Sequence, residues 1–299
     1  MFVNFFLNKL LFLIAILIAF NNSFAQDFDY EIEIINELFE QIVNTRNDKH
    51  KLELNEQIVE NIELILNDEE SFNYDFSELE FIVILSSDDN KLKIYNWNIA
   101  LFDGTFKYFG FLQHLHGRNE INVFKLNDLS DFYEEEGRHF SGHKEWFGAL
   151  YYEIITKRWN RVTYYTLIGW DGANFLINRK VIEVLYFCDE GLPHFGNKMF
   201  VVGNTRKDRM IFEYANRAAM LLRYNSKNDI IVIDHLSPPD SKYKGMRQYY
   251  GPDLSYDALE FKMGSWIFKS DIDPDIAINY ERNRRVNVLR RERESKLNR

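Results

Sequence analysis

The chain has 299 residues, of which 46% are hydrophobic and 27% charged, and its formal net charge is −10. This negative charge argues against a nucleic-acid partner, because binding to phosphates depends on clustered lysine and arginine. The single cysteine, Cys188, excludes an internal disulfide, so a hydrophobic core must hold the chain together. Neither phosphate-binding pattern, G-x-x-x-x-G-K or G-x-G-x-x-G, occurs in the sequence, which argues against a nucleotide.

Residues 1–25 are predicted to be a secretory signal peptide. Lys9 precedes an apolar run over 10–20, and Ala25 suits a peptidase that cuts after a small residue. The run is shorter than the roughly 20 residues of a membrane-spanning helix; an uncleaved anchor that also uses residues 2–6 is the alternative. We therefore expect an exported protein that is periplasmic, outer-membrane-associated or secreted, with membrane contact only as a peripheral association.

Residues 26–70 are predicted to form a helical pair. Apolar residues recur at helical spacing in two stretches, 35–42 and 54–65. Between them, Asn47 and Asp48 are suitable N-caps for the second helix. Two helices of this size cannot bury their apolar stripes alone, so we expect the pair to dock on the rest of the chain or on a partner.

Residues 71–275 are predicted to form one mainly antiparallel β domain, because short runs rich in Phe, Tyr, Ile and Val alternate with turns of Asp, Asn, Gly and Ser. The predicted strands are 79–85, 92–98, 105–115, 121–125, 147–155, 162–170, 180–187, 199–202, 210–214, 220–224 and 230–234. Short connections such as SSDDN, SKND and DG join neighbouring strands as antiparallel hairpins, because parallel pairing needs crossovers of roughly a dozen residues or more. The predicted fold is an antiparallel sandwich or open barrel. A propeller-like arrangement is the alternative, since IYNWNIALFDGTFKYFGFLQ echoes IGWDGANFLINRKVIEVLYF.

Two later segments are predicted to lack strands. The stretch 236–255 is predicted to be a long loop, and loops of that size are often functional. Residues 276–299 are predicted to be a basic C-terminal tail, in which 281–299 contain eight Lys or Arg and three Glu. Such a tail is typical of a solvated helix or a disordered end.

The sequence Trp170-Asp171-Gly172 is predicted to be a hairpin turn; a catalytic loop is the alternative. Asp-Gly between two apolar strands indicates a type I′ turn. In the following strand Glu183 stands among apolar residues, so it must be either paired or exposed. Arg179 or Arg223 could be its partner.

Five phrases of the second half, GWDG, RKVIEVLYF, IFEYAN, DHLSP and YGPDLSYDAL, resemble an uncharacterised family of exported proteins from Bacteroidetes-type bacteria, as does the leader ending SFAQ. The resemblance covers roughly residues 151–266. It implies export and an origin in bacteria of that type. It carries over no catalytic residue, because no activity is assigned to that family.

Two histidine pairs are candidates for a metal site. His114 and His116 have strand spacing, and His139 and His143 are one helical turn apart, so each pair could point in one direction. Neutral imidazole is a ligand for zinc, copper or nickel. Ordinary exposed or hydrogen-bonded histidines are the alternative, and no cofactor is predicted.

An aromatic and acidic group near the long loop is a candidate for ligand binding. Its members are Tyr249, Tyr250, Asp253, Tyr256 and Asp257. Aromatic platforms beside carboxylates are used by grooves that bind sugars or peptides. A packed turn with tyrosine hydroxyls bonded to the backbone is the alternative.

These patterns favour a noncatalytic exported envelope protein that binds or scaffolds an envelope protein or a glycan. The alternative is a metal-dependent or Asp/His-based hydrolase acting on an extracytoplasmic polymer. For the hydrolase, Asp234 and His235 end a predicted strand where an acid or base could stand, although no G-x-S-x-G motif precedes them. An outer-membrane barrel is the third possibility, because aromatic residues make up 16% of the chain.

Overall fold

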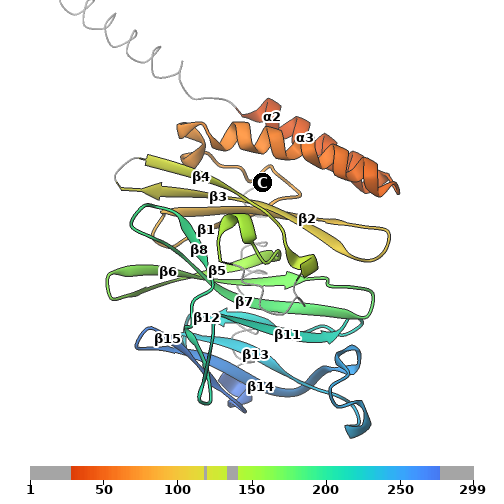
Figure 1. Cartoon of the computed structure of the whole chain (residues 1–299), viewed down its shortest axis with the longest axis vertical. Helices are drawn as coiled ribbons and strands as arrows, with labels where there is room; N and C mark the ends of the chain where they lie inside the picture. Colours follow the sequence, from red (N-terminus) through yellow and green to blue (C-terminus); the bar gives the residue numbers. More distant parts are fainter. Residues whose placement is uncertain (1–27, 118–119, 133–140, 277–299) are drawn as a thin grey trace, which may run out of the picture.

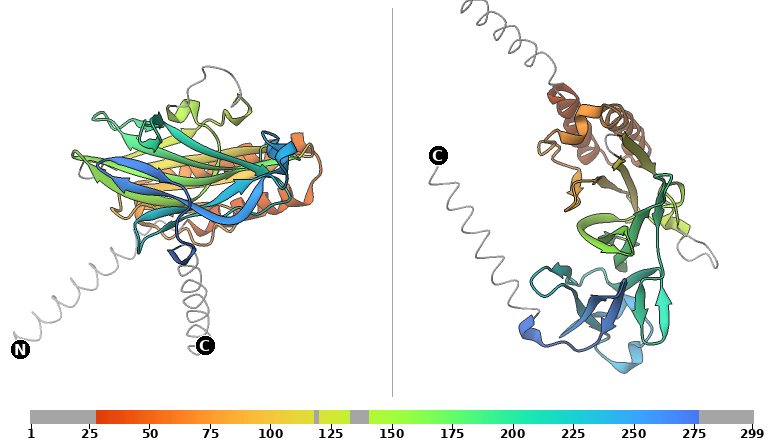
Figure 2. Two further views of the ribbon diagram at one scale, coloured as in Figure 1. Left: turned by 90° about the horizontal axis from the view of Figure 1, so that it is seen from below. Right: turned by 90° about the vertical axis from the view of Figure 1, so that its left-hand side faces the viewer.

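The structure is a computed structural model, and it describes residues 28–117, 120–132 and 141–276. The predicted signal peptide and all but the first residue of the predicted basic tail lie outside them. The described residues form four layers, two helices followed by three stacked β-sheets (Figures 1 and 2). The predicted mainly β fold preceded by a helical pair is confirmed. The stacked sheets agree with the sandwich and not with the propeller.

The first layer consists of α2 (Asp29–Asn44) and α3 (Asp48–Leu66), followed by the 3-10 helix η1 (Glu69–Asn73). As predicted, Asn47 caps α3, since its side chain accepts a hydrogen bond from the backbone N–H of His50 (3.2 Å). The apolar stripes of both helices pack on one face of the first sheet, around Trp97. The helical pair therefore docks on its own chain. None of the described helices combines the length and the hydropathy needed to cross a membrane.

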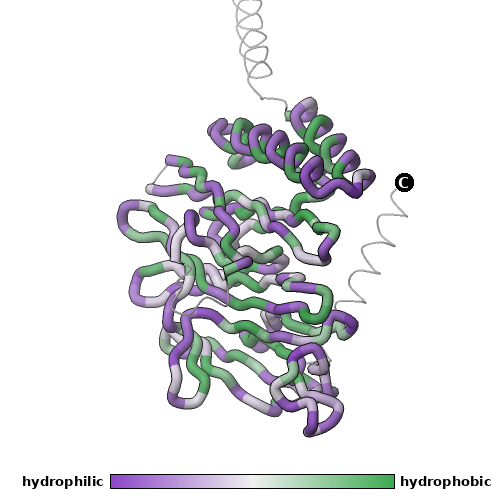
Figure 3. Tube along the Cα trace, turned by 45° about the vertical axis from the view of Figure 1, so that its right-hand side comes forward, coloured by the Kyte–Doolittle hydropathy of each residue, from purple (hydrophilic) through white to green (hydrophobic). Residues whose placement is uncertain are grey.

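The first sheet has four antiparallel strands in the order β1-β2-β3-β4. They are β1 (Val83–Ser86), β2 (Leu92–Ala100), β3 (Phe106–His116) and β4 (Glu120–Leu126). Successive side chains of β2 point to opposite faces, so Tyr95 and Trp97 contact the helices while Leu92 and Ile94 contact the next sheet. Hydrophobic stretches run along the strands inside the stack, and hydrophilic residues are frequent in the loops at its edges (Figure 3).

The central sheet has the strand order β11-β7-β6-β5, and β8 pairs with β7. Its strands are β5 (Leu150–Trp159), β6 (Val162–Asp171), β7 (Ile177–Phe187), β8 (Pro193–Phe195) and β11 (Arg209–Ala215). Leu167 and Val181 pack toward the first sheet, whereas Ile168 and Ile182 pack toward the last one. The central sheet is therefore covered on both faces.

The last sheet has the strand order β10-β9-β15-β14-β13-β12. Its strands are β9 (Phe200–Val202), β10 (Thr205–Lys207), β12 (Leu222–Asn225), β13 (Ile230–Ser237), β14 (Gly251–Lys262) and β15 (Ser265–Lys269). All pairs are antiparallel except β15 with β9, where Trp266 lies opposite Phe200. The sequence prediction missed β8, β10, β14 and β15.

The predicted loop over 236–255 is wrong at both ends. Strand β13 continues to Ser237, and β14 begins at Gly251, which pairs with Ser237. Between them lie two short 3-10 helices, η4 (Ser241–Tyr243) and η5 (Arg247–Tyr249). The start of β14 contains Gly, Pro and Asp, which are depleted in strands, so residue preference alone predicts a turn there.

Buried side-chain hydrogen bonds cross the boundaries between the sheets. Asn96 of β2 accepts a hydrogen bond from the backbone N–H of Tyr151 (2.6 Å), beside the register shift of β5. Trp266 of the last sheet donates its indole N–H to the hydroxyl of Thr166 in the central sheet (2.9 Å). Because a buried polar group without a partner is costly, each bond fixes one sheet against the next.

A similar hydrogen bond joins the helices to the first sheet, and its contribution to stability can be tested. Trp97 Nε1 donates to Asn55 Oδ1 (2.7 Å), and both residues are buried. Trp97→Phe removes the donor and leaves the amide oxygen unpaired, so we expect a loss of about 1–3 kcal/mol in the free energy of unfolding, measured with urea. The double variant Trp97→Phe/Asn55→Leu removes both polar groups and should recover part of that loss. A single variant as stable as the native chain would contradict this role for the bond.

Candidate functional site

Loops from all three sheets meet along one edge of the molecule, on the right in Figure 1. They are the β2–β3 turn (101–105), the β6–β7 loop (172–176), the β11–β12 connection (216–221) and the loop before β14 (238–250). Phe175 packs so closely on Gly104 that a Cβ there would lie 2.3 Å from its ring. Asn216 Nδ2 donates to the carbonyl of Phe175 (3.0 Å), and Ala215 N donates to the carbonyl of Tyr250 (2.9 Å). We call this region the loop edge.

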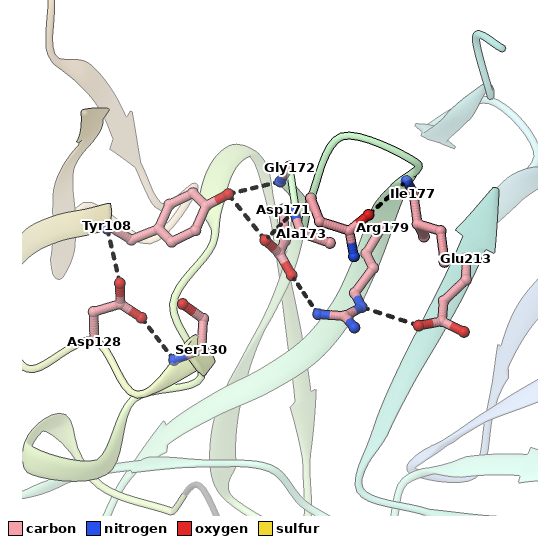
Figure 4. Close-up of polar contacts among 10 residues, drawn as sticks. Tyr108, Asp128, Ser130, Asp171, Gly172, Ala173, Ile177, Arg179 and Glu213 are labelled. Atoms are coloured by element: carbon pink, nitrogen blue, oxygen red, sulfur yellow. Dashed lines mark hydrogen bonds and ion pairs between the residues drawn. The ribbon is translucent and has the colours of Figure 1, made fainter. Parts of the chain in front are cut away.

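A pocket of about 240 Å³ opens at the loop edge. It is lined by Thr105, Phe106, Ser130, Asp131, Asp171, Ala173, Asn174 and Arg179. These residues come from the first sheet, from the 3-10 helix η2 (Ser130–Phe132) that follows β4, and from the central sheet. The pocket therefore lies between two layers, and Figure 4 shows the polar contacts that hold its wall.

Three charged residues in or beside this wall lie directly opposite one another on neighbouring strands. We call Asp171 of β6, Arg179 of β7 and Glu213 of β11 the charge row. Arg179 Nη1 donates to Asp171 Oδ2 (3.2 Å), and Nε donates to Glu213 Oε1 (3.1 Å; Figure 4). Asp171 and Arg179 are only 2% and 7% exposed. Burial opposes the charge of Arg179, but the two carboxylates outweigh it and raise the pKa of the guanidinium.

Tyr108 of β3 connects the charge row to the first sheet. Its hydroxyl donates to Asp171 Oδ1 (3.0 Å) and accepts the backbone N–H of Gly172 (2.7 Å; Figure 4). Ala173 N also donates to Asp171 Oδ1 (2.9 Å). Burial and then the charge of Asp171 raise the pKa of Tyr108, so the hydroxyl stays a neutral donor. The backbone N–H of Tyr108 donates to Asp128 Oδ2 (2.9 Å), which ties the segment after β4 to the same group.

The hairpin predicted at Asp171-Gly172 forms, but the predicted type I′ turn is wrong. The β6–β7 loop has five residues, and the positive φ falls on Ala173 (36°). A Cβ at Gly172 would lie 2.2 Å from the ring of Phe106, so glycine is needed there for close packing. The Trp-Asp-Gly sequence thus supplies a buried carboxylate and a tight contact in the pocket wall.

Glu183 pairs with Arg209, not with Arg179 or Arg223. Glu183 has an exposed fraction of 0% and lies opposite Arg209 on β11. Arg209 Nε donates to Glu183 Oε2 (2.8 Å), and Tyr151 donates its hydroxyl to the other carboxylate oxygen. Burial and then the charge of Glu183 raise the pKa of Tyr151. The central sheet therefore holds a second compensated charge, away from the pocket.

Of the histidines predicted as metal ligands, His114 and His116 lie at the end of β3 that is opposite the loop edge. The rings of His114 and His116 are 6.3 Å apart, which agrees with the predicted common side. His114 stacks on Phe187 at 3.5 Å, and burial lowers its pKa to about 4. His143 lies in the 3-10 helix η3 (His143–Glu145), and His139 lies outside the described residues. Within the described ranges, no group of three or more possible ligands is arranged to hold a metal.

The residues predicted as one ligand groove are divided between two places. They are Tyr249, Tyr250, Asp253, Tyr256 and Asp257. Tyr249 stacks on Tyr243 (4.3 Å), and the Tyr250 hydroxyl accepts the backbone N–H of Gly245 (3.0 Å), so both belong to the loop edge. The other three follow along β14. Asp253 accepts local hydrogen bonds from the backbone N–H and the hydroxyl of Ser255, two residues further along β14.

Asp257 instead contacts His235, a pairing that local sequence does not reveal. The register of β13 with β14 shifts between Asp234 and Leu236, so His235 lies at a β-bulge, a feature that re-aims side chains. His235 Nδ1 lies 2.9 Å from Asp257 Oδ2, and the side chains are 45% and 8% exposed. The hydrogen bond to Asp257 raises the pKa of His235. Asp234 faces elsewhere and accepts the backbone N–H of Leu221 (2.7 Å).

The pocket at the loop edge combines the groups that orient a small polar ligand. Two carboxylates accept hydrogen bonds, a guanidinium and an amide donate them, two hydroxyls do both, and Phe106 adds an aromatic face. Comparison with protein-family models, curated proteins and solved structures found no match for the chain. The geometry of the site therefore carries the functional argument.

The charge row yields a stability prediction. Arg179→Met removes the cation between two carboxylates, and an uncompensated buried charge costs about 3–5 kcal/mol. We expect a loss of that size in the free energy of unfolding, measured with urea. Glu213→Gln removes only the more exposed carboxylate, so it should cost less. If Arg179→Met lowers the free energy of unfolding no more than Glu213→Gln does, the central position of Arg179 in the charge row is contradicted.

The contact of His235 with Asp257 yields a pH prediction. Because the pKa of His235 is raised in the folded state, its stabilisation is fully present below the unfolded pKa of about 6.5 and is lost as pH rises through the folded pKa. Free energies of unfolding measured from pH 5 to 9 should show this fall, and His235→Gln should lack it. A folded pKa at or below the unfolded value, measured by NMR titration, would refute the contact.

Proposed function

We propose that the protein is an exported, noncatalytic binding protein of a bacterial envelope and that the pocket at the loop edge holds its ligand. The observation that carries this proposal is the fixed wall of the pocket. Asp171 and Arg179 are buried and bonded to each other, and Tyr108 bonds to the same carboxylate. A site whose polar groups are held in place before binding loses less conformational entropy when the ligand arrives.

Export is supported by the leader-like residues 1–25 and by the resemblance of 151–266 to exported bacterial proteins. On this proposal the mature chain begins at Gln26 and resides in the periplasm, at the outer membrane or outside the cell. Its partner is an envelope protein or a glycan. The net charge of −10 disfavours nucleic acid, and membrane contact is at most peripheral.

The test compares two charge reversals on opposite edges of the molecule. Asp131 lines the pocket, whereas Asp88 lies in the β1–β2 turn at the other edge and is exposed. The mature protein and each variant are immobilised and incubated with a solubilised envelope fraction. We expect Asp131→Lys to lose the component that the native protein retains and Asp88→Lys to keep it. If both variants retain the envelope component equally, the pocket is not the binding site. A product that still carries residues 1–25 and is located in the cytosol would refute export.

One observation favours a second candidate, the Asp/His-based hydrolase. The buried Asp257 holds Nδ1 of the half-exposed His235, and in this candidate the other ring nitrogen, Nε2, acts as the general base. Release of reducing ends or amines from a purified envelope polymer, lost in His235→Gln, would favour this candidate over the first. Activity that survives in His235→Gln would exclude the pair as its catalytic base.

A further inference from the structure

We infer that the pocket at the loop edge binds one neutral, hydroxyl-rich ring, the single sugar unit of an envelope glycan. This inference rests on the proposed binding function and adds the chemical class of the ligand. Four properties of the pocket lead to it: the balance of its charges, its mixture of donors and acceptors, its aromatic surface and its size.

The charges that face the pocket are already compensated. Asp171 is paired with Arg179, and Asp131 is paired with Lys107. A ligand with a net charge would therefore meet no uncompensated countercharge, and it would still lose its hydration on entering. A neutral polar ligand avoids that cost.

The polar groups of the pocket match hydroxyls better than carbonyls or amines. Carboxylates only accept hydrogen bonds and guanidinium only donates them, whereas a hydroxyl does both. Neighbouring hydroxyls can therefore donate to Asp131 and accept from Arg179 at once. Asn174 adds donors, because its Oδ1 is already used by the backbone N–H groups of Leu176 (2.9 Å) and Ile177 (3.1 Å), which leaves its amide N–H groups for a ligand.

Aromatic rings supply the surface for the less polar face of such a ring. Phe106 lines the pocket and is held edge-to-face against Trp170, with centroids 5.0 Å apart and planes at 76°. Outside the pocket, Phe102 and Phe175 are 79% and 64% exposed on the two loops that flank it. Aromatic side chains are common in the lining of ligand sites. Phe102 and Phe175 are placed to contact further units of the same glycan chain.

The size of the pocket corresponds to one ring. A cavity of about 150 Å³ holds benzene, which has about six heavy atoms, so each atom needs roughly 25 Å³. The volume of about 240 Å³ then holds roughly ten heavy atoms. A hexopyranose has about twelve, so a single ring places most of its atoms inside the pocket and the rest at the open mouth, whereas a disaccharide is too large.

The experiment uses saturation-transfer NMR on the full mature protein with named probes. The neutral probes are the methyl glycosides of glucose, galactose, mannose and N-acetylglucosamine. Methyl glucuronide tests a charged ring, tetrahydropyran a ring without hydroxyls, and triglycine a peptide. We expect at least one neutral glycoside to bind, tetrahydropyran to give no signal, and methyl glucuronide to bind at least about tenfold more weakly, because ionised groups are costly to desolvate.

Two alanine variants locate the binding. Asp131 has a half-exposed side chain outside the buried charge row, so Asp131→Ala should fold normally and weaken the glycoside by about tenfold or more, as expected for a hydrogen bond to a charged group. Asp88→Ala at the opposite edge should leave it unchanged. Glycoside binding that is equal in both variants would overturn the assignment of this pocket.

Failure of the ligand class is distinguishable from failure of the proposed function. If triglycine or methyl glucuronide binds in an Asp131-dependent way and no neutral glycoside does, the sugar inference is wrong while the pocket remains a binding site. If no probe binds and Asp131→Lys retains the same envelope component as Asp88→Lys, both proposals fail. Binding of a neutral glycoside that Asp131→Ala abolishes supports both.

Discussion

The structure depends on the compensation of charges inside a sheet that is covered on both faces. The central sheet packs against the first sheet on one side and the last sheet on the other, yet it carries the buried charges Asp171, Arg179 and Glu183, together with Arg209, whose side chain is 9% exposed. Each of these charges lies directly opposite a partner of opposite sign on the neighbouring strand. Since a one-residue slip would separate every pair, the charges also specify the register of β6, β7 and β11.

The same constraint places the candidate site. The charge row ends where β6 and β7 meet their loop, and it is extended by Tyr108 from the first sheet and by Arg247, whose Nε lies 4.0 Å from Glu213 Oε2. Polar contacts thus run from the first sheet, through the central sheet, to the loop before β14. Because the pocket shares Asp171 and Arg179 with this network, its wall is held by the core of the protein.

Much of the fold, but little of the site, could be predicted from the sequence. Helical and alternating periodicity identified both helices and most strands, and Asn47 marked the start of α3. Strands β8 and β10 span only three residues, too few to show a period, and they lack the run of apolar residues that marks the equally short β9. The pocket was not predicted, for a different reason. A two-residue turn at Asp171-Gly172 would change the pairing register of β6 with β7, and Asp171 would then no longer lie opposite Arg179. The identity of the partner of Glu183 depends likewise on the pairing of β11 with β7, and the sequence around Glu183 does not indicate that pairing.

Residue-resolved hydrogen exchange on the native protein tests the central claim most directly. If the covered central sheet with its paired charges organises the molecule, the amides of 165–169 and 181–185 should exchange only through global unfolding, and no amide of the other sheets should exchange more slowly. Rates in the first and last sheets should be equal or faster. The account would be contradicted if these central amides exchanged through local opening while the amides of β2 or β13 remained protected.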